Sequence, residues 1–245
     1  MRNEQVTSMD GHIGDIEEPQ RIVAAQSTQR YAMTMSDMGL IHIIDDDAGV
    51  RKALSSLIRS VGNDVRIYES TSKFLESKLP DVPSCLLLDV RMPGSNGLDF
   101  QASLVNRGIF LPVILMTGYG DIQMSVQGMK AGAVDFLTKP LRHQDVLVAI
   151  DAALLRDRER RKESSEISAV RAQYAQLTPR EVQVFNLVTA GKMNKQMAGE
   201  LNLSEITVKL HRGSMMKKMG VRTVADLVKQ AEVLRRAAKP SREDI

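Results

Sequence analysis

The feature of this sequence that most restricts its fold is a series of five short apolar runs, each followed by a longer segment with apolar residues at helical spacing. Runs of this length with few polar residues are typical of strands buried on both faces of a parallel sheet. Five strand–helix repeats predict a doubly wound, five-stranded parallel α/β domain. The five runs are Leu40–Ile44, Val65–Tyr68, Ser84–Leu88, Val113–Met116 and Val134–Leu137.

A different pattern begins after this domain. Residues 156–163 mix basic and acidic side chains without Gly or Pro, which predicts an extension of the fifth helix or a helical linker, with a solvated face rather than a nucleic-acid patch. Thr178-Pro179-Arg180-Glu181 has Thr at an N-cap, Pro at the first helical position and Glu at the third. From there to Glu232 the pattern is helical, with breaks at Gly191, Asn202 and Gly220. We therefore predict a second, all-α domain.

The predicted organisation has four parts. They are a flexible tail (1–36), the α/β domain (37–155), the helical linker (156–173) and the all-α domain (174–240). Residues 156–245 carry 19 basic and 11 acidic residues, a net charge of +8, whereas the whole chain has a net charge of only +3. This excess predicts a polyanion as the partner of the C-terminal part.

Cysteine usage and hydropathy exclude two classes of protein. Cys85 is the single cysteine, which excludes an intramolecular disulfide framework and a clustered-cysteine zinc site. No apolar run approaches the roughly 20 residues that span a bilayer. We expect a cytoplasmic protein without a membrane partner. Cys85 and His42 both lie inside apolar runs, so we expect a small buried thiol and a core histidine with its hydrogen bonds satisfied.

Polar residues follow the apolar runs at the points where the strands end. Because the carboxyl ends of parallel strands meet at one edge of a sheet, we expect these side chains to converge there. Grouped carboxylates repel one another, and Mg²⁺ suits a small carboxylate cluster that leaves it several waters. A lysine and a hydroxyl opposite the metal favour a phosphoryl group as the ligand. The residues are Asp45, Asp46, Asp47, Asp89, Thr117 and Lys139. The alternative for the aspartate triplet is a helix N-terminus favoured by the helix dipole, which we assign to Asp47.

Together these residues resemble the receiver domain of two-component response regulators. The separations fit the family: 43 residues from Asp46 to Asp89, 28 from there to Thr117 and 22 from there to Lys139. The resemblance covers about residues 38–155. It is carried by Ile43–Asp47, Leu88–Gly94, Met116–Gly118 and Ala133–Pro140.

The resemblance implies a role for each residue at this edge. Asp89 accepts a phosphoryl group from a sensor histidine kinase. Asp46, Asp89 and the backbone carbonyl of Arg91 bind Mg²⁺, and Asp45 acts through a water.

The same resemblance assigns the residues that respond to the phosphoryl group. Lys139 pairs with its oxygens and Thr117 donates a hydrogen bond to one of them. Phe136 takes the position of an aromatic ring that changes rotamer as Thr117 moves, although as Phe it has no hydroxyl to assist. The bond between Lys139 and Pro140 is expected to be cis.

Residues 177–233 resemble the four-helix DNA-binding domain of LuxR- and FixJ-type regulators. The resemblance predicts a helix-turn-helix with its first helix at Asn194–Leu201, a turn at Asn202-Leu203 and a recognition helix that begins after Ser204 and continues to Met219. It is carried by Leu177–Glu181, Gly191–Ala198 and Leu203–Arg212. The alternative is a helical dimerisation module whose Met residues form the core.

Helical spacing sorts the recognition helix into two faces. Val208, Met215 and Met219 are predicted to pack inward, and Lys209, Leu210, Gly213 and Lys217 to lie on the opposite face. Lys209 is the main candidate for a base contact, and Leu210 for contact with a thymine methyl group. Gly213 offers no side chain, so we expect much of the affinity to come from phosphate contacts. The candidates for these phosphate contacts are Lys195, Thr207, Arg212 and Lys217, and Asn194 and Ser204 complete the predicted DNA-binding set.

The sequence as a whole predicts a transcriptional activator of the FixJ/NarL/LuxR type rather than an enzyme, similar to FixJ and to rhizobial nodulation regulators. Such a regulator forms a homodimer when phosphorylated, binds promoter DNA and contacts RNA polymerase. Two alternatives are an aspartyl-phosphate phosphatase and a small-molecule sensor. The phosphatase usually has a second carboxylate two residues after the nucleophile, where this chain has Arg91. The sensor needs an apolar pocket with a few polar anchors, whereas the strand ends of this chain carry carboxylates.

Overall fold

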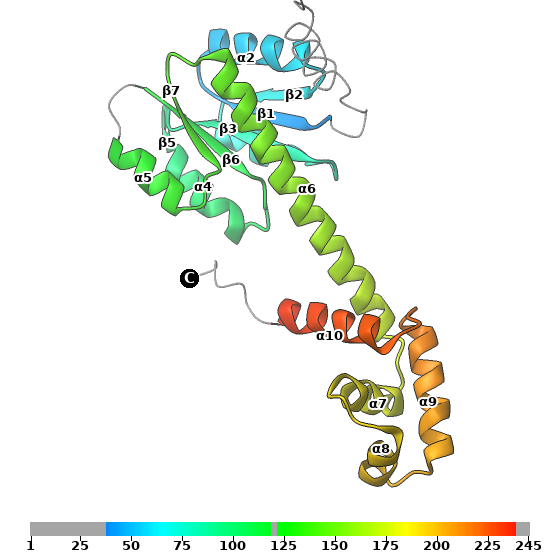
Figure 1. The fold of residues 1–245 in the computed structure, drawn as a ribbon. Coiled ribbons are helices and arrows are strands. Elements are labelled where there is room, and N and C mark those ends of the chain that lie inside the picture. Colours follow the sequence, from blue (N-terminus) through cyan, green and yellow to red (C-terminus); the bar gives the residue numbers. More distant parts are fainter. Residues whose placement is uncertain (1–37, 119–121, 239–245) are drawn as a thin grey trace, which may run out of the picture. The chain divides into compact units, whose positions relative to one another are not determined.

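A computed structural model describes residues 38–118 and 122–238 of the chain (Figure 1). The predicted tail, residues 1–36, lies outside the described residues. The chain forms two compact units, with the division between Leu147 and Val148 inside one long helix and residues 110–112 assigned to the second unit. No helix in the described ranges is long and apolar enough to cross a membrane.

The first unit is built on a five-stranded sheet in the order β2-β1-β3-β6-β7, and every pairing in it is parallel (Figure 1). This confirms the predicted doubly wound α/β fold, and the strand ends differ from the predicted runs by one residue at most. The strands are β1 (Leu40–Ile44), β2 (Asp64–Tyr68), β3 (Ser84–Asp89), β6 (Val113–Thr117) and β7 (Asp135–Thr138). A two-stranded hairpin, β4 (Arg91–Met92) with β5 (Ser95–Asn96), follows β3.

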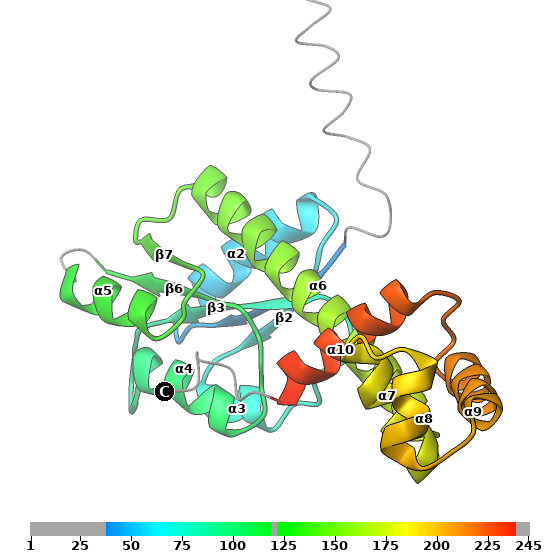
Figure 2. The ribbon, with the colours of Figure 1, turned by 60° about the horizontal axis from the view of Figure 1, so that its bottom comes forward.

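Helices cover both faces of this sheet. Helix α2 lies on one face, and α3, α4 and α5 lie on the other (Figure 2). Because the central strands β1, β3 and β6 are covered on both sides, each of their residues is buried. Asp47 caps α2, accepting hydrogen bonds from the backbone N–H groups of Gly49 and Val50, as predicted. The helices are α2 (Ala48–Ser60), α3 (Thr71–Leu75), α4 (Gly97–Asn106), α5 (Ile122–Lys130) and the start of α6 (His143–Tyr174).

Cys85 and His42 are fully buried in β3 and β1, as expected. The His42 ring stacks on Tyr68 and meets the edge of Phe74. Its Nδ1 lies 3.2 Å from the Tyr68 hydroxyl, but its Nε2 has no hydrogen-bond partner, so the histidine is satisfied at one nitrogen only. Burial, assisted by the charge of Arg66, lowers the pKa of His42 to about 4. The ring is therefore neutral and apolar in effect at neutral pH.

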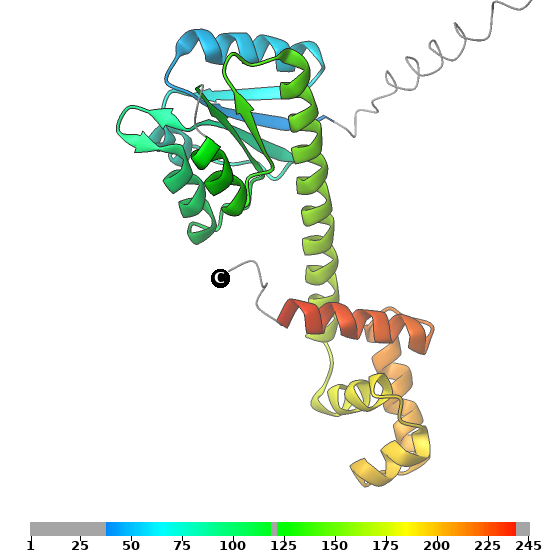
Figure 3. The same ribbon diagram turned by 60° about the vertical axis from the view of Figure 1, so that its left-hand side comes forward.

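The second unit is helical, as predicted, and its four C-terminal helices follow the last turns of α6 (Figure 3). Its core includes Val184, Met197, Val208, Met215 and Leu227, all fully buried. The helices are α7 (Pro179–Thr189), α8 (Asn194–Leu201), α9 (Glu205–Lys218) and α10 (Val224–Ala238). The α8 bounds match the predicted first helix of the helix-turn-helix, and Asn202 after it adopts the left-handed conformation, with φ of 54°.

The charged stretch is part of α6, as the predicted extension of the fifth helix requires, but one residue contradicts the solvated interpretation. Asp157 is fully buried, and its carboxylate pairs with Arg160 and Arg161 at 2.7 and 2.6 Å. A sequence of mixed charges does not reveal which single residue turns inward. The two arginines at i+3 and i+4 neutralise the buried charge from the same helix.

A buried carboxylate holds α7 to α9 in the second unit. Glu181 closes the predicted capping box with Thr178, which is the N-cap of α7. Its carboxylate also accepts hydrogen bonds from the Ser214 hydroxyl and the Lys218 ammonium group, both at 2.6 Å. Burial by itself would raise the pKa of Glu181, but the bonds from Lys218, Ser214 and Thr178 outweigh it and lower the pKa to about 2.

We expect Glu181→Gln to destabilise the second unit by about 1–3 kcal/mol at neutral pH, because the neutral amide leaves Lys218 without its counter-charge. The ordinary glutamate pKa is 4.5 and the folded-state value is about 2. The stabilisation is therefore complete above about pH 4.5 and is lost as the pH falls towards 2. Calorimetric unfolding of both proteins across this range measures the difference. Glu232→Gln, at an exposed position of α10, is the control. A gap between Glu181→Gln and wild type that stays constant with pH would contradict the assignment.

Candidate functional site

The predicted carboxylates and lysine meet at the carboxyl edge of the first unit's sheet. Asp45 follows β1, Asp89 ends β3 and Lys139 follows β7. The Lys139 ammonium nitrogen lies 2.7 Å from Asp45 Oδ2 and 2.6 Å from Asp89 Oδ2. Both carboxylates are buried, and Lys139 is about one quarter exposed. A single cation thus bridges two anions that the sheet topology forces together.

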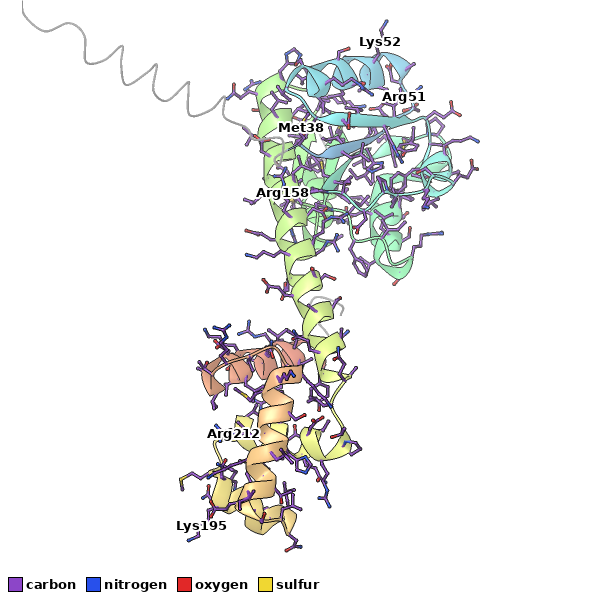
Figure 4. The ribbon with its side chains drawn as sticks, turned by 90° about the vertical axis from the view of Figure 1, so that its right-hand side faces the viewer. Met38, Arg51, Lys52, Arg158, Lys195 and Arg212 are labelled. Atoms are coloured by element: carbon purple, nitrogen blue, oxygen red, sulfur yellow. The ribbon has the colours of Figure 1, made fainter. Side chains whose placement is uncertain are left out.

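Backbone contacts fix the direction of each carboxylate. The other oxygen of Asp45 accepts a hydrogen bond from Asp47 N at 2.9 Å, and that of Asp89 accepts one from Arg91 N at 3.0 Å. Arg51 on α2 donates a hydrogen bond from its guanidinium group to the Asp45 carbonyl oxygen at 2.6 Å (Figure 4). Each carboxylate therefore presents one oxygen to Lys139 and uses the other to hold its own turn.

A close backbone approach shapes the turn after Asp89. Gly97 N donates to the Val90 carbonyl at 3.0 Å, and a Cβ at Gly97 would lie 2.6 Å from the Asp89 carbonyl oxygen. No side chain fits in that space, because the atoms it would meet are backbone. Gly97 therefore lets the first residue of α4 lie against the end of β3. Along the chain, the residues between β3 and α4 form the β4–β5 hairpin (Figure 3).

The donor set at this edge fits a hard divalent cation. Asp45, Asp46 and Asp89 each offer a carboxylate oxygen, and the three oxygens lie within 4.8 Å of one another. Opposite ligands of octahedral Mg²⁺ are about 4.2 Å apart, so small side-chain rotations bring these oxygens into range. Asp46 is exposed, which gives an ion access from solvent. The three aspartates predicted from the sequence are thus brought together, with the backbone of Arg91 beside them.

Burial and pairing act in opposite directions on this cluster. Burial raises the pKa of Asp45, and the hydrogen bond from Lys139 opposes that rise without cancelling it. For Lys139, burial lowers the pKa, but its bonds to Asp45 and Asp89 outweigh burial and raise it. The lysine therefore stays charged and supplies the positive charge that the buried carboxylates require.

Thr117 and Phe136 lie on the two strands beside the cluster. Thr117 is fully buried at the end of β6, and its carbonyl oxygen accepts a hydrogen bond from Lys139 N at 2.7 Å. Phe136 is half-buried on β7, paired in register with Leu115. The Lys139–Pro140 peptide bond is cis, as expected. The backbone of Thr117 is therefore linked directly to the residue that bridges the carboxylates.

The recognition helix of the second unit presents the two predicted faces. Val208, Met215 and Met219 are fully buried on one side of α9. On the opposite side lie the exposed residues Lys209, Leu210, Gly213 and Lys217. Ser204 caps α9, accepting a hydrogen bond from Thr207 N, and its hydroxyl lies 2.8 Å from that of Thr207.

The other predicted DNA-binding residues differ in exposure and in their hydrogen bonds. Lys195 is exposed on α8 (Figure 4). Arg212 is half-buried and donates a hydrogen bond to Asn194 Oδ1 at 2.9 Å, so these two residues already link α9 to α8. Helical spacing does not indicate this contact, which only the tertiary structure shows.

Three residues that shape these surfaces were missed in the sequence. Arg51 and Gly97 organise the carboxylate edge through backbone groups, and no residue pattern signals a contact with a carbonyl oxygen. Ile206 is highly exposed on α9. Helical spacing indicates the exposure of Ile206, because Ile206 lies four residues before Leu210 and therefore on the same helical face.

Each unit matches a known family. Residues 41–151 match the response regulator receiver domain. Residues 175–231 match the luxR family of bacterial regulatory proteins.

Similar proteins cover both units. Nodulation protein W of Bradyrhizobium diazoefficiens is 48% identical over 199 residues, covering 81% of this chain and 88% of that protein. The response regulator protein TodT of Pseudomonas putida is 46% identical, covering 82% of this chain and 89% of its own length. The transcriptional regulatory protein FixJ of Azorhizobium caulinodans is 38% identical, with 78% and 90% covered. The solved structure of the response regulator StyR is 42% identical, with a TM-score of 0.73, and the two chains are covered to 80% and 98%.

We expect Mg²⁺ to stabilise the first unit against thermal unfolding, because the cation relieves repulsion among Asp45, Asp46 and Asp89. At ten times its dissociation constant a bound ion contributes about 1.4 kcal/mol. Calorimetry of the full chain with and without MgCl₂ measures the gain. Asp46→Asn should abolish most of the gain in stability from Mg²⁺, because it removes one of the three carboxylates. Since Asp46 is exposed, this substitution leaves the Lys139 bridge intact. Asp99→Asn on α4 is the control; an equal loss of the Mg²⁺ response in both variants would rule out this cluster as the site.

Proposed function

Because the chain belongs to the two-component response regulators that combine a receiver domain with a LuxR-type DNA-binding domain, we propose that phosphorylation of Asp89 controls its dimerisation and promoter binding. A phosphorylation-dependent, DNA-binding regulator of this family works with a histidine kinase and with DNA. The proposal adds which residues carry out each step. It also adds the homodimer, the contact with RNA polymerase and the cytoplasmic location that DNA binding requires.

The Lys139 bridge between Asp45 and Asp89 carries the proposal. An Asp89 carboxylate oxygen attacks the phosphorus of a phosphohistidine, the phosphorus–nitrogen bond breaks, and an acyl phosphate forms on Asp89. Lys139, already 2.6 Å from Asp89, exchanges that contact for a phosphoryl oxygen. Asp46, Asp89 and the backbone carbonyl of Arg91 would hold Mg²⁺, with Asp45 acting through a water, and the ion would neutralise charge on the transferred group. Arg91 N keeps the second Asp89 oxygen in place during the attack.

The signal passes from the phosphoryl group through Thr117 and Phe136. The Thr117 hydroxyl donates a hydrogen bond to a phosphoryl oxygen, and its backbone is already joined to Lys139 N. The half-buried ring of Phe136 on the neighbouring strand β7 then repacks. Phosphorylation thereby favours one of two arrangements of this face, which is a population shift. The favoured arrangement dimerises, and the dimer activates transcription.

The second unit supplies the DNA contacts. The exposed face of α9 enters the major groove with Lys209 towards the bases, while Lys195 and Lys217 contact phosphates. Thr207 and Arg212 are further phosphate contacts, and the bonds of Thr207 to Ser204 and of Arg212 to Asn194 hold them in place. Two such units in a dimer suit two half-sites one helical turn apart. A nodulation-type target is one we propose on likeness to nodulation protein W alone.

We expect the full chain, incubated with MgCl₂ and acetyl phosphate, to gain one base-labile phosphoryl group. Asp89→Asn should gain none, because an amide is not a nucleophile here. Asp99→Asn, at an exposed position of α4, should gain the group as the wild type does. Intact-mass spectrometry before and after alkali reads the result. Phosphorylation of Asp89→Asn, or none of the wild type, would overturn the assignment of Asp89.

We expect the affinity for duplex DNA to fall steeply with salt, with a slope of about −0.9 per phosphate contacted in a plot of log affinity against log salt. Lys195→Ala should weaken binding and reduce the slope by about one unit. Lys229→Ala, exposed on α10, should change neither. Fluorescence anisotropy over a salt series gives both values. A slope near zero would count against phosphate contacts as the source of affinity.

A further inference from the structure

The most exposed large apolar side chains of the described residues gather in the helix-turn-helix. Ile206 is 79% exposed, Leu210 71% and Met193 67%. The next in order, Val148, is 56% exposed. A scattered exposed apolar residue is ordinary on a protein surface. Two of the most exposed lie one turn apart on the same helix, which is a local pattern that needs a cause.

Ile206 and Leu210 head a continuous stripe along α9. Ile206, Leu210, Gly213 and Lys217 follow one another at i, i+4, i+7 and i+11. This stripe lies opposite the side that buries Val208 and Met215. The first two turns of the stripe are therefore apolar, the third has no side chain and the last is basic.

The fold itself does not explain the stripe. A Cβ at Gly213 would meet nothing within 4 Å, so packing does not require glycine there. A glycine inside a helix costs about 1 kcal/mol relative to alanine. Ile206 and Leu210 likewise contribute little to the core at such exposure. All three residues make physical sense only if this side of α9 lies close against another molecule.

The charges beside the stripe identify that molecule. Helix α9 has one acidic residue, Glu205, against four basic ones. Of these, Lys218 pairs with Glu181 and Arg212 with Asn194, which leaves Lys209 beside the stripe and Lys217 at its end as the exposed basic groups. A surface that is apolar in its first turns and carries exposed lysines beside and beyond them suits the major groove of DNA, where phosphates line both walls. The apolar group that projects into this groove is the C5-methyl of thymine.

We propose that Ile206, with Leu210, forms an apolar ridge that selects thymine methyl groups in the half-site, and that Gly213 lets the helix approach the groove closely. This rests on the proposed DNA-binding function and adds Ile206 as a specificity-determining residue. Because Gly213 offers no side chain to read a base by hydrogen bonding, methyl contacts supply discrimination in its place. The bound sequence therefore contains thymines opposite the first two turns of α9.

Replacement of thymine by deoxyuridine tests the ridge, because it removes the methyl group and keeps base pairing. A duplex is first selected from a random pool with the full-length protein, and its thymines are then replaced by deoxyuridine one at a time. Each methyl buried against the ridge is worth about 0.8 kcal/mol, or about 4-fold in affinity. The wild type should lose roughly this factor at two or more positions.

The variants locate the effect. Ile206→Ala should bind the thymine duplex more weakly and lose the deoxyuridine effect at one position, and Leu210→Ala should lose it at a neighbouring position. Ile206→Val, which keeps most of the contact, should retain it. Lys209→Ala should bind more weakly yet keep the full deoxyuridine effect. Because Ile206 is exposed, thermal unfolding of Ile206→Ala should match the wild type, which separates the contact from folding.

Two results would overturn the inference. A wild type that binds the selected duplex but responds to deoxyuridine nowhere has no methyl-reading ridge. An Ile206→Ala variant that keeps every deoxyuridine effect removes Ile206 from the ridge, as would be seen if this surface served a protein partner. Binding to no duplex at any salt would instead overturn the proposed function, and this inference with it.

Discussion

The two bonds that Lys139 makes to Asp45 and Asp89 determine how the carboxyl edge of the sheet is built. Parallel strands β1 and β3 lie side by side, so their terminal carboxylates are forced into one buried space. Removing either charge from water without a partner costs several kcal/mol, and only a nearby cation offsets that cost. The return of β7 to the same edge brings that cation. The order of the strands therefore determines which charged side chains meet at the site.

The second unit also contains a buried carboxylate that a lysine neutralises, but there the group has a structural role. Glu181 is also a buried carboxylate with a lysine at 2.6 Å, yet Thr178 and Ser214 complete its hydrogen bonds from two helices. Both carboxylate oxygens accept hydrogen bonds, so the group fixes the packing of α7 on α9. At the sheet edge, by contrast, exposed Asp46 adds a third anion that Lys139 does not contact in the structure. The Glu181 carboxylate has a structural role, whereas the sheet-edge cluster retains excess negative charge, which a divalent cation is able to neutralise.

Features set by local chemistry were predictable from the sequence, and features set by backbone proximity were not. The buried strands, the caps at Asp47, Thr178 and Ser204, and the α8 bounds follow from periodicity and capping preferences. The convergence of Asp45, Asp89 and Lys139 followed from the topology of parallel sheets. Gly97 was missed because its role is to clear the Asp89 carbonyl, and Asp157 because neighbouring charges hid a single inward-facing position. Both depend on how close two segments come, which a one-dimensional pattern does not contain.

In the proposed mechanism, Lys139 also explains why a phosphoryl group has an effect beyond its own site. A ligand shifts an equilibrium only by contacts that differ between the two states. Phosphorylation converts the Asp89 carboxylate into an acyl phosphate and places charged phosphoryl oxygens beside Lys139, so the partners of Lys139 change. Its backbone N–H is bonded to the Thr117 carbonyl, and Thr117 is in register with Thr138 on β7. A displacement of Lys139 is therefore a displacement of the β6–β7 edge that carries Phe136. The bridge that stabilises the resting state is the same contact whose exchange transmits the signal.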